Sequence, residues 1–63
     1  MEYLRKLREG QRLTQAQLAE KLGVKRVTVT NWENGVNKPR ADMLLKLSDV
    51  LKCPIDYLLR HYE

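Results

Sequence analysis

Apolar residues recur at helical spacing along nearly the whole chain, in short stretches that are separated by turn residues. Tyr3, Leu4 and Leu7 predict a first helix over about Glu2–Glu9. Inward Leu44, Leu47, Val50 and Leu51 predict a fourth helix over Ala41–Leu51. Pro54 suits the start of a fifth, whose apolar stripe is Ile55, Leu58, Leu59 and Tyr62. Strand-like alternation occurs only at 27–30, inside a better helical pattern. The sequence therefore predicts an all-α fold, a bundle of about five short helices.

The second helix has three agreeing start signals. Thr14 is a favourable N-cap, Gln17 completes a capping box, and Leu13 and Leu18 occupy the two positions of a hydrophobic staple. Gly23 suits the left-handed residue that ends this helix. A third helix follows almost at once, from after Val24 to about Asn34. Two helices joined by so short a turn must cross steeply.

The third helix has two chemically different faces. Val29 and Trp32 lie on one side and are the expected core anchors. The opposite arc, roughly 140° wide, contains no acidic residue, and its members are Arg26, Val27, Thr30, Asn31 and Asn34. A solvated helix face would favour stronger helix formers such as Glu, Lys or Ala. A major groove needs this chemistry instead, because Arg can bind guanine, Asn can bind adenine, and apolar groups can contact the thymine methyl. The alternative is an ordinary surface, with Val27 packed against a neighbouring element.

Charge points in the same direction. The 63 residues carry twelve Lys and Arg against eight Asp and Glu, a net charge of +4. A basic domain favours a polyanionic partner, nucleic acid first, although a merely soluble basic surface would have the same balance. The charge is concentrated, because residues 25–40 contain four cations and one acid, Glu33. We expect Glu33 to pair with Arg5 or Arg8 of the first helix.

Several function classes are disfavoured by composition. The only cysteine, Cys53, cannot form an intramolecular disulfide, and with a single histidine, His61, it cannot build a zinc site. Cys53 is expected to be a buried apolar residue. With one serine and no phosphate-binding glycine loop, an enzyme is not expected, and neither is a cofactor. No apolar run approaches the roughly 18 residues of a membrane span, and no signal peptide is evident. We therefore expect a cytoplasmic protein.

A family resemblance covers nearly the whole chain. The stretch Gln15–Val24 (QAQLAEKLGV), followed by Val29, the stretch Trp32–Gly35 (WENG) and Lys38–Pro39, closely resembles the Cro/repressor-type, or XRE-like, helix-turn-helix family. The resemblance implies a single domain over residues 1–63, a helix-turn-helix at about residues 15–34, and a third helix that enters the major groove of DNA. It does not cover every position, because Arg12 and Lys52 stand where the family often has glycine.

The resemblance also implies roles for individual residues. The base-reading positions are Arg26, Val27 and Asn31, with Thr28 and Thr30 at the edges. The positions that contact the DNA backbone are Thr14, Gln15, Lys25, Asn34, Lys38 and Arg40. Lys25 replaces the Ser or Thr that usually caps the third helix, which weakens that cap by about 1 kcal/mol.

The sequence thus predicts a transcriptional regulator that binds double-stranded DNA, encoded by a bacterium, an archaeon or a phage. It would be a repressor-like homodimer that reads a near-palindromic operator, with a dimer surface at Ile55, Tyr57, Leu58 and Tyr62. The alternative is an adaptor, similar to an antitoxin or an antirepressor, whose fifth helix binds a protein partner. An adaptor would not need an acid-free outer arc on the third helix.

Overall fold

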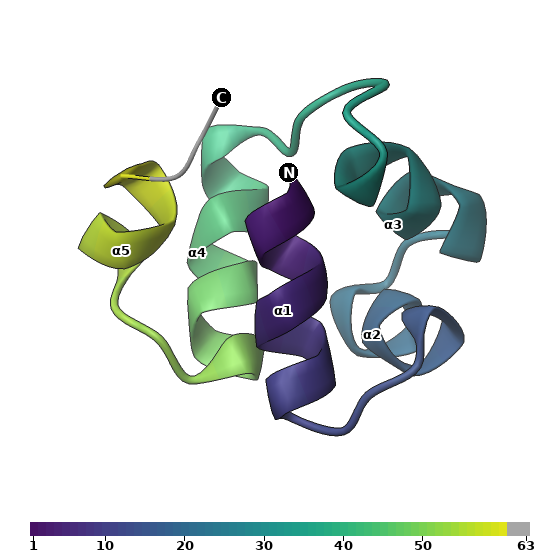
Figure 1. Ribbon diagram of the computed structural model, residues 1–63, viewed down its shortest axis with the longest axis horizontal. Helices are drawn as coiled ribbons and strands as arrows, with labels where there is room; N and C mark the ends of the chain where they lie inside the picture. Colours follow the sequence, from purple (N-terminus) through teal and green to yellow (C-terminus); the bar gives the residue numbers. More distant parts are fainter. Residues whose placement is uncertain (61–63) are drawn as a thin grey trace.

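The computed structural model describes residues 1–60, and helices make up most of them (Figure 1). The helices are α1 (Glu2–Gly10), α2 (Gln15–Leu22), α3 (Arg26–Glu33), α4 (Ala41–Leu51) and α5 (Ile55–Arg60). Residues 1–60 contain no strand. The predicted all-α bundle is confirmed, and the predicted helices lie within one or two residues of the observed ones. His61 and Tyr62, which figure in the predictions, lie outside the described residues.

A leucine-rich core holds the helices together. α2 packs against both α3 and α4, α1 packs against α3, and α5 packs against α4. The completely buried apolar side chains include Leu4, Leu18, Val29, Leu47 and Leu58. Trp32 is also buried, as its phase on the third helix predicts. The core therefore takes one side chain or more from every helix.

Both ends of α2 have the predicted local structure. The Thr14 hydroxyl accepts a hydrogen bond from the Gln17 backbone N–H at 3.0 Å, and the Gln17 side chain accepts one from the Thr14 N–H at 2.8 Å. Gly23 has a φ of +74°, so it ends α2 in the left-handed conformation. Ala19 is buried. These features confirm the capping box at the start of α2 and the left-handed glycine at its end.

The structure changes the prediction for α5. Leu58 is completely buried, so the prediction that it lies at a dimer surface is wrong. The neighbouring Leu59, predicted for the inward stripe, is 53% exposed instead. The six described residues of α5 make fewer than two turns, so only a narrow strip of this segment can face the core. Leu58 occupies that strip, and Leu59 is rotated out of it.

Within residues 1–60, two non-glycine residues have left-handed backbone conformations. Arg12 has a φ of +57° in the turn before α2, and Lys52 has a φ of +56° at the end of α4. These are the two positions at which the resembling family often has glycine. The left-handed conformation costs an L-residue roughly 1–2 kcal/mol, because Cβ crowds the following carbonyl oxygen.

Replacing Lys52 by glycine should therefore stabilise the protein. We expect Lys52→Gly to raise the free energy of unfolding by about 0.5–1 kcal/mol, the relief of strain being partly offset by the greater freedom of glycine in the unfolded chain. Urea unfolding measures this change. Lys52→Ala is the control, because it removes the same charge and keeps the Cβ. An equal gain in both variants would show that charge, and not backbone strain, is responsible.

Candidate nucleic-acid interface

The outer face of α3 is open, as its sequence pattern predicts. Val27 is 57% exposed, Arg26 is also exposed, and Val29 on the opposite side is completely buried. The alternative in which Val27 packs against a neighbouring element is therefore wrong. Arg26, Val27 and Thr30 line a shallow hollow of about 240 Å³ on this face. Asn31 is half-buried at its edge of the helix, and Asn34 is exposed.

The first turn of α3 has no side-chain cap. Lys25 is the N-cap residue, and its side chain makes no capping hydrogen bond. The side chain is exposed. This agrees with the weakened cap that the sequence predicts. A cation therefore stands where the family usually has a capping hydroxyl.

Behind α3 lies a buried ion pair. The Glu33 side chain has no solvent exposure, and its Oε2 lies 2.6 Å from Arg8 Nε. Arg8 Nη2 lies 3.3 Å from Glu33 Oε1, and Arg5 Nε lies 3.5 Å from the same oxygen. Arg8 Nη1 also donates to the Leu13 carbonyl at 2.7 Å. The predicted pairing of Glu33 with α1 is thus confirmed with both arginines, and the pair is part of the interior.

Gln15 extends this network to the outer face. Its Nε2 donates to Glu33 Oε1 at 3.0 Å, and its Oε1 accepts from the Thr30 hydroxyl at 2.9 Å. The resemblance assigns Gln15 to a DNA phosphate and Thr30 to a base, but it does not indicate that the two side chains bind each other. No spacing along the chain could reveal it, because the contact joins two helices.

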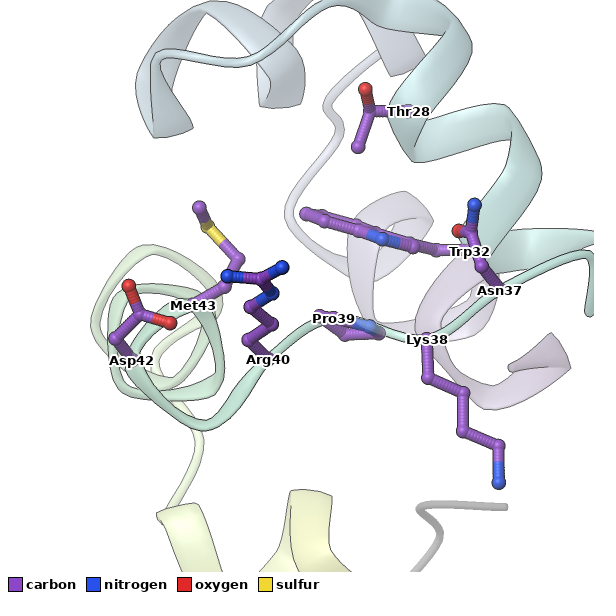
Figure 2. A pocket seen from close by; sticks show the side chains of 8 residues that line it. All are labelled: Thr28, Trp32, Asn37, Lys38, Pro39, Arg40, Asp42 and Met43. Atoms are coloured by element: carbon purple, nitrogen blue, oxygen red, sulfur yellow. The ribbon is translucent and has the colours of Figure 1, made fainter.

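The loop before α4 forms a second hollow, with a volume of about 430 Å³ (Figure 2). Thr28 and Trp32 of α3 line it, together with loop residues 37–40 and the first turn of α4. Thr28 therefore faces this loop and not the hollow beside Val27. Figure 2 shows the Arg40 guanidinium directed between Met43 and Trp32, whereas the Lys38 side chain points away from the pocket. Of the two predicted loop cations, only Arg40 is directed into it.

The predicted dimer surface is partly engaged within the chain. Tyr57 is 40% exposed and meets the Tyr3 ring edge-to-face, with ring centroids 5.3 Å apart. A hydrogen bond with Tyr57 raises the pKa of Tyr3 to about 12. Ile55 is half-buried against the core. Ile55 and Tyr57 thus connect α5 to the rest of the bundle as well as bordering solvent.

Cys53 is half-buried, and burial raises the pKa of its thiol.

Within residues 1–60, His, Cys, Asp and Glu side chains form no cluster of three or more that could hold a metal ion. None of the five described helices is long and apolar enough to span a membrane.

Comparisons with known proteins all find helix-turn-helix proteins. The sequence profile described as helix-turn-helix matches residues 4–58. The HTH-type transcriptional activator BcrR of Enterococcus faecalis is 43% identical over 98% of this chain and 30% of its own length. YqaE of Bacillus subtilis, an HTH-type transcriptional regulator, is 39% identical over 94% of this chain and 51% of its own. The chain thus spans about half of the length of YqaE and less than a third of the length of BcrR.

A solved structure matches over most of both chains. The c2 repressor of phage P22, crystallised in complex with a synthetic operator, superposes with a TM-score of 0.84 at 37% identity. The match covers 90% of this chain and 86% of that one. At this level of similarity the two proteins share the fold of the helix bundle.

The Glu33 network should make stability depend on pH. Burial by itself would raise the pKa of Glu33, but the hydrogen bonds from Arg8 and Gln15, with the Arg8 charge, more than offset it and lower the pKa. The stabilisation is therefore complete above the unfolded-state pKa of about 4.3 and is lost as the pH falls through the lower folded-state value. We expect Glu33→Gln to cost about 3 kcal/mol at pH 7.

Urea unfolding of both proteins between pH 7 and pH 3 measures this difference. The difference in the free energy of unfolding between wild type and Glu33→Gln should narrow at the acid end, because Glu33 binds a proton in the unfolded chain at a higher pH than in the folded protein. Asp49→Asn, which removes an exposed carboxylate on α4, is the control and should change stability little at any pH. A gap that stays constant down to pH 3 would contradict the assignment.

Proposed function

Because the chain belongs to the Cro/repressor-type (XRE) helix-turn-helix family, we propose that it is a sequence-specific regulator of transcription that binds double-stranded DNA through α3. The observation that carries the proposal is the outer face of α3, which is exposed and free of acidic residues. A phosphate-lined groove would repel an acidic side chain there. The P22 c2 repressor, which has the same fold, was crystallised in complex with a synthetic operator, and this supports DNA binding by the present chain.

The proposed DNA contacts are of two kinds: contacts with base edges, made by side chains of α3, and contacts with the DNA backbone. Arg26 can donate two hydrogen bonds to guanine O6 and N7, Asn31 can bind adenine N6 and N7, and exposed Val27 can contact a thymine methyl. Thr28 and Thr30 lie at the edges of this set. The DNA backbone is held by residues on both sides of α3: Thr14, Gln15, Lys25, Asn34, Lys38 and Arg40. Backbone contacts fix the register, and base contacts choose the sequence.

One such domain offers few base contacts, so we propose that it acts as a homodimer. Its two α3 helices would read half-sites about 34 Å apart in a near-palindrome. The contact surface would use Ile55 and Tyr57, together with exposed Leu59 and with Tyr62, which lies outside the described residues. The relatives include an activator and a repressor. We propose that the protein represses transcription by occluding a promoter. We also propose that it acts in the cytoplasm of the host.

Selection from random DNA duplexes at about 150 mM salt tests the function, because weak phosphate-driven binding is suppressed there. An enriched inverted repeat is the expected result. A single enriched half-site would retain sequence-specific binding and contradict the dimer. If the folded protein enriches nothing, the proposal is wrong, and an adaptor that binds a protein partner becomes the better account.

Mutation of a base-contacting residue and mutation of a phosphate-contacting residue should affect DNA binding in different ways. We expect Arg26→Ala to cost about 1–3 kcal/mol in operator binding and to relax one base position, whereas Lys38→Ala should weaken all sequences alike. Titration of each variant against the operator and a scrambled duplex measures both effects. Lys52→Ala is the charge-matched control, because the α4–α5 turn lies across the molecule from α3 (Figure 1). Equal loss of specificity in Arg26→Ala and Lys38→Ala would contradict this division.

A further inference from the structure

The Thr30 hydroxyl, on the outer half of α3, is already bonded within the protein. It lies 2.9 Å from Gln15 Oε1 and 3.2 Å from the Arg26 carbonyl oxygen one turn earlier. A hydroxyl has one hydrogen, and both of these neighbours are acceptors that can share it. To donate to a base, Thr30 would have to give up its bond to Gln15.

These bonds also determine where the methyl group stands. Threonine has few χ1 rotamers in a helix, and the bond to the carbonyl four residues earlier selects one of them. The oxygen and the methyl occupy different staggered positions on Cβ, so the methyl is turned away from the Arg26 carbonyl. Thr30 lines the hollow that it shares with Arg26 and Val27. We take the methyl as the part of Thr30 that faces this hollow, since the hydroxyl is engaged behind it.

The same hydroxyl helps to orient Gln15. Glu33 is an acceptor only, so it requires the Nε2 end of the Gln15 amide, and the Thr30 hydroxyl donates to the Oε1 end. A flipped amide would place its oxygen against the Glu33 carboxylate. In the observed orientation, one N–H of Gln15 is used by neither bond and is available for a phosphate oxygen.

We propose that Thr30 is a specificity-determining residue with two tasks: its methyl group contacts the C5-methyl of a thymine beside Val27, and its hydroxyl positions Gln15 to bind a backbone phosphate. The inference rests on the proposed function. It assigns Thr30 an apolar contact with a base instead of a hydrogen bond to one. A thymine methyl is an apolar group of the size that a shallow hollow with two aliphatic walls can accept.

Two variants separate the tasks. Thr30→Val keeps a methyl group and the side-chain shape but removes the hydroxyl, whereas Thr30→Ser keeps the hydroxyl and removes the methyl. Each is titrated against the selected operator and against operators in which single thymines are replaced by uracil, which lacks the C5-methyl. Each is also combined with Gln15→Ala. Thermal unfolding of every variant checks that the protein is folded.

Wild type should bind less tightly, by about 3-fold or more, when one particular thymine is replaced by uracil. Thr30→Ser should lose this discrimination, and Thr30→Val should keep it. Thr30→Val should instead bind all operators more weakly by a similar factor, and it should have no further effect in a Gln15→Ala background, because the two residues act through one contact.

The opposite pattern overturns the inference. If Thr30→Val loses a base preference that Thr30→Ser keeps, the hydroxyl is the reader. If the effects of Thr30→Val and Gln15→Ala multiply independently, the hydroxyl does not act through Gln15. Because exposed Val27 can also contact a thymine methyl, the uracil effect is assigned to Thr30 only if Thr30→Ser loses it, and Thr30→Ala, which also removes the methyl, replaces that variant if it does not fold. If the wild-type protein selects no operator, the proposed function itself is wrong. If it selects an operator and the variants behave in either of the ways just described, only the role of Thr30 is wrong.

Discussion

A carboxylate buried without solvent exposure at the end of α3 determines how the other elements of the binding face are arranged. Taking Glu33 out of water costs several kcal/mol unless its oxygens are fully bonded. Arg8 from α1 and Gln15 from α2 supply those bonds, and Arg8 also holds the Leu13 carbonyl in the turn between them. Any shift of one helix would leave a charge unpaired in the interior. α1, α2 and α3 are therefore joined by one polar group in addition to the apolar core that they share.

Because the buried side of α3 is held by these interactions, its exposed outer face can consist of residues with low helix propensity. Val, Thr and Asn weaken an isolated helix of eight residues, and Lys25 provides no side-chain cap. The helix persists because Val29, Trp32 and Glu33 are held in the interior. The front is then available for side chains chosen for their chemistry. The hydrogen bond from Thr30 to Gln15 connects the two sides, so the support also reaches the reading face.

Local signals predicted most of the fold. The capping box at Thr14, the end of α2 at Gly23 and the inward phase of Trp32 each depend on residues within about one turn, and all are confirmed. The left-handed backbone at Lys52 was not predicted, although the family often has glycine at this position.

Contacts between helices were predicted less well. The burial of Glu33 and the bond between Gln15 and Thr30 depend on how helices cross, and a periodic pattern carries no information on that angle. Leu58 was misassigned for a related reason, since on a short helix apolar residues of the core and of an interface have the same spacing. The direction of Lys38 depends on the path of a loop, which has no period at all.

The most direct test of the α3 surface is to record backbone amide chemical shifts while a duplex carrying the selected operator is added. The structure predicts that the largest changes occur along residues 26–31, in the first turn of α2 and in the loop over residues 36–40. Changes concentrated on α5 and on the exposed side of α4, with the amides of α3 unaffected, would show that another surface binds DNA and would contradict the account.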